Sequence, residues 1–415
     1  MPHAAPSTHP AGAHAPTHDV LVVGGGLVGA SLAIALERIG IDVALVEATA
    51  ADAMPPVFDE RNLSFNEATL HALRALGVLD ALRAPTGAIT RIHVSRAGDF
   101  GRVLLRAEDH GRREFGRVVV ARDFGEALEA RLAALPRITR YRPARFVGLD
   151  AAAGDTRAVR IVDAQGERVL RARLLVAADG THSNVRDALG IEADVHDYAQ
   201  TLFVARLRAA RAPDGTAYER LTDDGPTALL PRGDRHYGLV HAVARADADA
   251  VRALDDAAFL ARVQQAFGWR AGRFVQVGAR STYEAIRRVA RATIADRAVL
   301  VGNAAQALHP VGAQGFNLGL RDALTLAEML ETGGDPGDAA RLQAYAARRR
   351  DDRERTLRFS DGLARASANP ASIARPLRSV GLWAAGRLPS LQSALVGGAL
   401  GYRGDVPALC RGPRA

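Results

Sequence analysis

The feature that most constrains this chain is a glycine-rich turn between a strand and a helix near the N-terminus. An apolar, β-branched run from Val20 to Val23 leads into three glycines with the spacing G-x-G-x-x-G, at Gly24, Gly26 and Gly29. A helical apolar pattern follows, and a second strand-like run ends at Glu47. Strand, tight turn, helix and strand in this order predict one βαβ unit of a parallel, Rossmann-like α/β sheet.

The glycines also indicate what this unit binds. Gly24 permits the tight turn, Gly26 lets the backbone approach a pyrophosphate, and Gly29 lets the helix pack closely on the strand. The pyrophosphate would meet the free N–H groups at the positive end of the helix. Glu47, which lies 18 residues after Gly29, can accept hydrogen bonds from ribose hydroxyls. We therefore predict a dinucleotide-binding site at this turn.

Length and composition are those of a globular protein without membrane-spanning runs, and 415 residues suffice for about two domains. Because Cys410 is the only cysteine, we expect no intrachain disulfide and no metal site. Residues 1–17 are rich in proline, alanine and histidine and do not resemble a signal peptide. We expect a disordered tail and a cytoplasmic protein.

The charge balance is basic but unusual. The net charge is +8 at pH 7, and all 54 basic residues are arginine. We interpret this as codon bias and predict no nucleic-acid partner, since no basic stripe is interleaved with aromatic residues. The absence of lysine excludes Schiff-base chemistry on a lysine side chain.

A second candidate turn follows a short apolar strand over Arg173 to Ala178. Asp179 and Gly180 stand at the carboxyl end of this strand, where α/β sheets bind their ligands, although an ordinary strand-to-helix turn would look similar. Two arginines elsewhere, Arg61 and Arg122, are equally consistent with cofactor contact and with a solvated surface position.

A third candidate turn lies far along the chain. The buried run Ala298 to Val301 ends at Gly302 and Asn303, and a loop rich in glycine and proline follows before a helix predicted to start at Asn317. This loop offers backbone N–H groups to an electron-rich ring, through Gly312, Ala313, Gln314 and Gly315, and we expect Asn317 to bind the cofactor as well. His309 is a weak candidate acid or base, because a histidine before proline is more often structural.

Other patterns outline the remaining elements. Helices are predicted over 66–77, 123–135 (with a capping-box-like start), 255–267 and 317–330, and from residue 338 onward. A hairpin is predicted from 158–162 and 167–170, and sheet strands from 201–207, 227–230 and 237–243. The apolar stretch 377–400 fits packing on the core better than contact with a membrane surface.

The three glycine blocks, in this order, resemble the flavoprotein aromatic hydroxylases that bind FAD and use NAD(P)H. More narrowly, VGNAAQALHPVGAQGFNLGLRDA, together with YERLTDDGPTALLP and FGWRAGRF, is similar to the ubiquinone-pathway branch, the 2-polyprenyl-6-methoxyphenol hydroxylases. The resemblance covers roughly Asp19 to Pro389. Most flavin hydroxylases have Gly-Asp at Gly302-Asn303, whereas this branch commonly has asparagine. Ala177 stands where glycine is usual, a minor deviation.

The resemblance implies a discontinuous FAD-binding domain (18–88, 112–194 and 286–345), an inserted antiparallel-sheet substrate domain (89–111 and 195–285) and a C-terminal helical segment (346–415). It implies that Asn303 holds the ribityl chain and that Gly312 to Gly315 line the flavin ring. Reduced flavin would add dioxygen, and a phenol would attack the resulting hydroperoxide.

The same resemblance implies the substrates and partners. These are a polyprenyl phenol, dioxygen and transiently bound NAD(P)H, with contacts to ubiquinone-biosynthesis proteins and peripheral contact with the inner membrane as further expectations. Two alternatives stay open: a hydroxylase of a small soluble aromatic compound, and a non-catalytic flavin-binding subunit of a biosynthetic complex.

Overall fold

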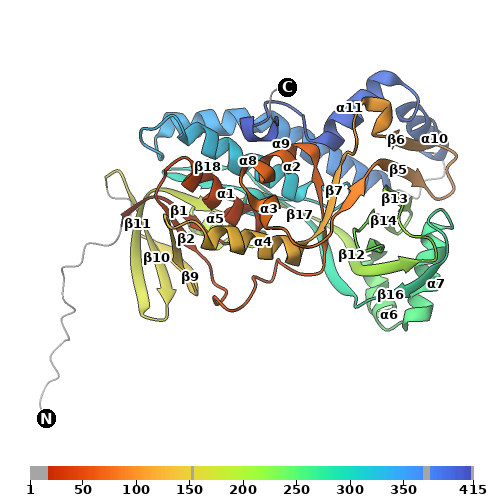
Figure 1. Ribbon diagram of the computed structural model, residues 1–415, viewed down its shortest axis with the longest axis horizontal. Coiled ribbons are helices and arrows are strands. Elements are labelled where there is room, and N and C mark those ends of the chain that lie inside the picture. The colour runs from red at the N-terminus through yellow and green to blue at the C-terminus, as the bar shows by residue number, and fades with distance from the viewer. Residues whose placement is uncertain (1–16, 151–153, 368–373, 413–415) are drawn as a thin grey trace, which may run out of the picture.

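The computed structural model describes residues 17–150, 154–367 and 374–412. Nearly all of the predicted N-terminal tail lies outside the described residues, but Thr17 already belongs to the first strand. Figure 1 shows one sheet with its helices on the left and a second sheet on the right, with long helices across the top. This mixed α/β architecture confirms the predicted fold class.

The first sheet is built around the predicted βαβ unit. β1 (Thr17–Val23) lies at its centre, between β2 (Val43–Val46) and β11 (Gly166–Ala177), and both neighbours run parallel to it. The path through this sheet is completed by β8 (Ile138–Tyr141) beside β2, and by β19 (Ala298–Leu300) and β18 (Ile294–Ala295) beyond β11. β8 and β19 are also parallel to their neighbours, so five adjacent strands present their carboxyl ends at one edge.

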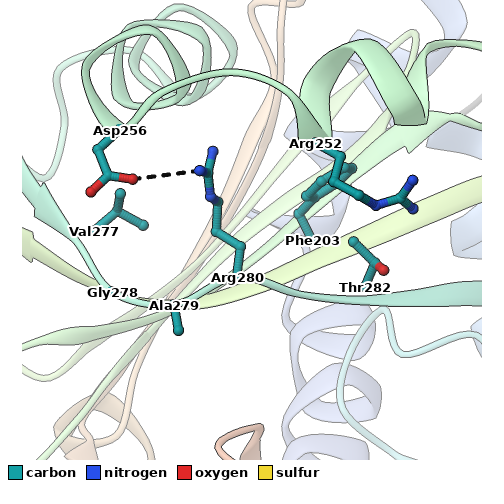
Figure 2. A pocket seen from close by; sticks show the side chains of 8 residues that line it. All are labelled: Phe203, Arg252, Asp256, Val277, Gly278, Ala279, Arg280 and Thr282. Atoms are coloured by element: carbon teal, nitrogen blue, oxygen red, sulfur yellow. Dashed lines mark ion pairs between the residues drawn. The ribbon is translucent and has the colours of Figure 1, made fainter.

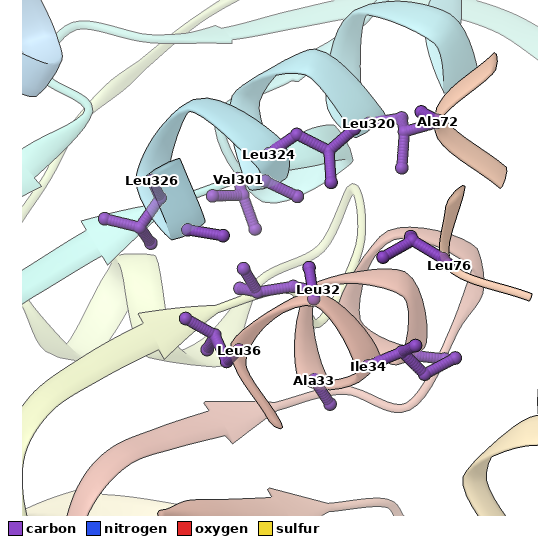
Figure 3. Packing of buried hydrophobic residues seen from close by; sticks show 14 of the residues in the cluster. Leu32, Ala33, Ile34, Leu36, Ala72, Leu76, Val301, Leu320, Leu324 and Leu326 are labelled. Carbon is purple, nitrogen blue, oxygen red and sulfur yellow. The ribbon is translucent and has the colours of Figure 1, made fainter. Parts of the chain in front are cut away.

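Both faces of this sheet are covered. Val20 and Val22 face a cluster formed with α1 (Leu27–Arg38), α4 (Ala121–Ala133) and α8 (Gly315–Leu330). Figure 3 shows leucines of α1 and α8 meeting in this cluster. Leu21 and Val23 face β9 (Ala144–Leu149), β10 (Arg157–Asp163) and α5 (Asn184–Ala188) on the other side. Burial on both faces explains why β1 is apolar from Val20 to Val23.

The second sheet has nine strands drawn from distant parts of the chain. Along its main path these are β20 (Gln306–Ala307), β17 (Ser281–Ala290), β12 (Ala193–Ala209), β15 (Tyr237–Ala244), β14 (Gly225–Pro231), β13 (Thr216–Thr222), β5 (Arg91–Arg96) and β6 (Arg102–Arg106). β16 (Phe274–Val277) pairs with β12. All these pairs are antiparallel except that of β13 with β5. One face packs on α7 (Asp256–Phe267) beside α6 (Ala248–Arg252).

The remaining elements connect the two sheets. A small sheet holds β3 (Asn62–Asn66), β7 (Gly116–Val120) and β4 (Gly87–Ile89), next to α2 (Glu67–Ala75) and α3 (Val78–Ala81). The C-terminal part forms α9 (Ala339–Ser367), α10 (Ala374–Ala385) and α11 (Pro389–Leu400). Within the described residues, no helix combines the length and the apolarity needed to cross a membrane.

The structure corrects several predicted boundaries. α4 begins at Ala121 directly after β7, and Asp123 lies inside the helix instead of capping it, because strand and helix join without an intervening loop. α8 begins at Gly315 instead of Asn317. The predicted hairpin is confirmed, but its second strand continues without a break to Ala177. The strands β13, β16 and β17 were not predicted.

Candidate functional site

The three predicted turns meet at one edge of the parallel sheet. β1 ends before Gly24, β11 before Asp179, and β19 before Gly302, and these three strands are neighbours. A carbon atom placed on Gly24 would lie 2.5 Å from the carbonyl oxygen of Ala178, so the first and second turns touch. This edge, where carboxyl ends of parallel strands converge, is where α/β sheets of this type bind ligands.

The first turn has the geometry that its glycines predict. A carbon atom on Gly29 would lie 1.9 Å from the carbonyl oxygen of Gly24, so any side chain would force α1 away from β1. The backbone of Gly24 has a φ of +104°, a conformation that favours glycine. Among the described residues, no side chain caps α1 at Gly26, and its first turn holds no acidic residue. The first N–H groups of the helix are therefore suited to an anion.

Glu47 closes the same turn from the neighbouring strand. Its carboxylate is buried and accepts hydrogen bonds from the backbone N–H groups of Gly25 and Thr49, each at 2.8 Å. The glycine turn and the end of β2 are thereby held together. Glu47 thus lies where the sequence placed it, beside the turn at the ends of β1 and β2.

The second turn is organised by Asp179. Its carboxylate accepts hydrogen bonds from the Ser183 hydroxyl and from the Val185 N–H, and Ser183 in turn caps α5. Burial raises the pKa of Asp179, and these hydrogen bonds oppose the shift. Gly180 follows with a φ of +85° and leaves the edge of the sheet unobstructed.

The third turn packs on the first. A carbon atom on Gly302 would lie 3.0 Å from Cγ2 of Val28, in the first turn of α1, and one on Gly319 would lie 2.8 Å from Cα of Gly302. The amide nitrogen of Asn303 is 3.5 Å from the Thr181 hydroxyl of the second turn. All three blocks predicted from the sequence are therefore in contact.

The loop before α8 adopts the irregular backbone that its composition indicates. Gly312 has a φ of +74° and Ala313 a φ of +49°, and the Gln314 amide donates to the Gly312 carbonyl. Gly315 begins α8. Asn317 is buried, donates to the Ser64 carbonyl and accepts from the Thr69 hydroxyl. Its side chain joins α8 to β3 and α2.

The two candidate arginines lie close to one loop. Arg61 forms a bidentate ion pair with Asp59 and stacks on the Tyr283 ring at 4.7 Å. Burial would raise the pKa of Asp59, but hydrogen bonds from Arg61 and Tyr283 outweigh it and leave the pKa below its usual value. Arg122 is half exposed and pairs with Glu60. Both guanidinium groups thus have carboxylate partners within the chain.

His309 has both ring nitrogens engaged. Nδ1 accepts a hydrogen bond from the Val311 N–H at 3.1 Å, which places the proton on Nε2, 3.2 Å from the side-chain oxygen of Gln200. Burial lowers the pKa of His309 to about 4, so the ring is neutral at pH 7. This arrangement favours the structural role over acid–base chemistry.

A cavity of about 550 Å³ opens elsewhere, between the second sheet and its helices α6 and α7. Figure 2 shows Arg280 pointing across it toward Asp256, with 3.5 Å between the guanidinium and the carboxylate. The other lining residues are Phe203, Arg252, Val277, Gly278, Ala279 and Thr282. This set differs from all the residues predicted to bind the cofactor.

Fold and site together define an α/β protein with a dinucleotide site at the carboxyl edge of a parallel sheet and a second, larger sheet beside it. A family model described as "FAD binding domain" matches residues 17–360. The ubiquinone hydroxylase UbiL of Rhodospirillum rubrum is 33% identical over 402 residues, covering 95% of this chain and 92% of that protein. The 3-demethoxyubiquinol 3-hydroxylase of Escherichia coli is 29% identical and covers 92% and 98%.

Among solved structures, the p-nitrophenol 4-monooxygenase PnpA of Pseudomonas putida DLL-E4 has the same fold, with a TM-score of 0.76 and 19% identity over 94% of this chain and 99% of that one. The chain belongs to the FAD-binding domain family of flavoprotein hydroxylases. It is an FAD-dependent monooxygenase, and the predicted cofactor is confirmed.

Sequence reasoning missed one buried carboxylate near the third turn. Glu219 lies on β13 and accepts a hydrogen bond from the Gly312 N–H. The sequence held a signal for it, because period-two alternation puts Glu219 on the same face as the apolar Ala217 and Leu221.

Proposed function

We propose that this monooxygenase hydroxylates a polyprenyl phenol in ubiquinone biosynthesis. The observation that carries the proposal is the similarity, over nearly the whole chain, to proteins named as ubiquinone hydroxylases. Asn303, in the position where that branch commonly has asparagine, supports the same assignment. The substrates would be the phenol, dioxygen and NAD(P)H.

The residues at the sheet edge fit FAD. The uncapped first turn of α1 would bind the pyrophosphate, and the Glu47 carboxylate would accept hydrogen bonds from a ribose. The Asn303 amide would hold the ribityl chain, and the loop from Gly312 to Gly315 would lie against the ring. When bound, FAD supplies the activation of dioxygen with electrons from NAD(P)H. The protein would orient the phenol and exclude water.

The test is a turnover assay with the purified, FAD-loaded protein. We expect NAD(P)H oxidation to be stimulated by a short-chain polyprenyl phenol and mass spectrometry to detect insertion of one oxygen atom into its ring. A small aromatic acid serves as the matched comparison substrate. Stimulation by the acid alone would assign a soluble substrate instead, and bound FAD without phenol-stimulated oxidation would contradict the enzymatic proposal.

We further propose that the enzyme contacts an anionic bilayer surface through an exposed apolar surface made by Phe100, Val380 and Trp383. Their exposed fractions are 73%, 52% and 49%. The β5–β6 turn and α10 are adjacent, since a carbon atom on Gly101 would lie 2.1 Å from the carbonyl oxygen of Ser379. Arg102 and Arg387 are exposed nearby in sequence and would suit anionic head groups.

A further inference from the structure

Glu219 faces the loop that the proposed function places against the flavin ring. Its neighbour Tyr218 points to the opposite face of β13, where its ring lies 5.5 Å from that of Phe267 in α7. Glu219 therefore lies on the face shared with Ala217, which packs toward α11. On this face the Gly312 N–H donates a hydrogen bond to the Glu219 carboxylate.

The two carboxylate oxygens of Glu219 differ in their surroundings. The Oε1 atom is shielded from solvent and has no hydrogen-bond partner among the described residues. A buried acceptor without a partner costs free energy and calls for an explanation. One explanation is that Oε1 is directed at a donor on a bound molecule.

The electrostatic surroundings suit proton exchange near neutral pH. Burial raises the pKa of Glu219 to about 7, and the Gly312 hydrogen bond opposes this shift. Among the described residues, no charged side chain contributes to it. A carboxylate with such a pKa is present at pH 7 in both its basic and its acidic form, as general-base catalysis requires.

We propose that Glu219 is a catalytic residue whose Oε1 accepts the hydroxyl proton of a phenol bound beside the loop from Gly312 to Gly315. The inference rests on the proposed function and names the group that activates its substrate. The phenol O–H bond breaks, its electron pair stays on the phenol oxygen, and the proton forms an O–H bond with Glu219. The phenolate oxygen then donates electron density into the ring, which makes the ring carbon a better nucleophile. Glu219 returns the proton to solvent after turnover.

The test compares Glu219→Gln with wild type in the FAD-loaded enzyme. The glutamine oxygen can still accept from the Gly312 N–H but cannot take a proton, so we expect unchanged FAD content and flavin absorbance. The expected kcat with the phenol falls about 10²–10⁴-fold, while NAD(P)H oxidation continues with release of hydrogen peroxide. The control is Glu108→Gln. The Glu108 side chain, which follows β6, is 75% exposed, so this variant should behave as wild type.

The pH dependence separates proton transfer from loop positioning. Because Glu219 must be ionised to accept a proton, wild-type kcat/KM should rise with pH through about 7. Glu219→Asp should keep this dependence with reduced kcat, and Glu219→Gln should lose it. The change in flavin absorbance on phenol binding measures affinity. Near pH 7 this affinity should depend on pH in wild type and in Glu219→Asp, but not in Glu219→Gln.

Failure of this inference and failure of the proposed function would give different results. Full activity and an unchanged pH profile in Glu219→Gln would overturn this inference and leave the proposed function standing. A wild-type enzyme without phenol-stimulated turnover would overturn the proposed function, and with it the role of Glu219.

Discussion

At the scale of single residues, the cofactor site depends on backbone positions that exclude side chains. Gly29 is the strictest of these, because the helix packs there directly on the carbonyl oxygen of Gly24. The sequence could predict this position, since the G-x-G-x-x-G spacing encodes a local chain path. Strand alternation could single out Glu219, but it could not predict the contact with Gly312, which is distant along the chain.

We expect Gly29→Ala to abolish FAD retention and to lower the free energy of unfolding by about 1–3 kcal/mol, because the added methyl group must displace α1 from β1. Absorbance of bound flavin after gel filtration and urea unfolding would measure both effects. Gly397→Ala is the matched control, because a carbon atom there meets nothing within 4 Å in α11. It should retain FAD and be neutral or stabilising. A Gly29→Ala protein that kept FAD would contradict the assigned packing.

At the scale of elements, α8 and α9 are joined by buried charges. Arg321 on α8 donates to both carboxylate oxygens of Asp352 on α9, and Arg349 donates to the same carboxylate. Burial would raise the pKa of Asp352, but the two arginines outweigh it and leave the pKa below its usual value. A run of mixed charge such as Arg348 to Arg355 is typical of a solvated helix face. The helical repeat of the sequence could not show which of these charges are buried, since Asp352 is buried and the adjacent Asp351 is exposed.

We expect Asp352→Asn to destabilise the protein by about 3–5 kcal/mol, because it leaves the buried Arg321 without its carboxylate and Arg349 with Asp322 as its remaining partner. Asp351→Asn, which removes an exposed partner of Arg355, should cost less than about 1 kcal/mol. Urea unfolding of the two variants at pH 7 measures the difference. Equal stabilities would show that the α8–α9 network contributes no more than a surface pair.

At the scale of the whole molecule, the exposed apolar surface and the cofactor site lie on different elements. The apolar surface is on the β5–β6 turn and α10, and the cofactor site is at the carboxyl ends of the parallel strands. The sequence predicted that 377–400 packs on the core. This is confirmed for α11, where Val396 and Leu400 are buried. Trp383 of α10 is instead exposed, because the register of a helix against a distant hairpin depends on tertiary contacts that no local pattern records.

We expect the wild-type protein to co-sediment with vesicles that contain phosphatidylglycerol and to bind phosphatidylcholine vesicles more weakly. The double variant Phe100→Ser with Trp383→Ser should bind the anionic vesicles at least about tenfold more weakly, since it removes two large apolar contacts. Val195→Ser changes another exposed apolar residue, on β12, and should leave binding unchanged. Equal binding by all three proteins would exclude the proposed surface.

The order of strands in the two sheets has a consequence for biosynthesis. β1 pairs with β11, β11 pairs with β19, and β20 adds to the second sheet only six residues after β19 ends, so segments far apart in the chain complete each sheet. Contacts so distant in sequence form slowly and late. While the ribosome is still translating the first 300 residues, the nascent chain has its phosphate-binding turn but lacks the strand and loop that complete the site. Stable uptake of FAD therefore follows translation of the loop from Gly312 to Gly315, and the fraction of newly made protein that matures depends on the supply of free flavin.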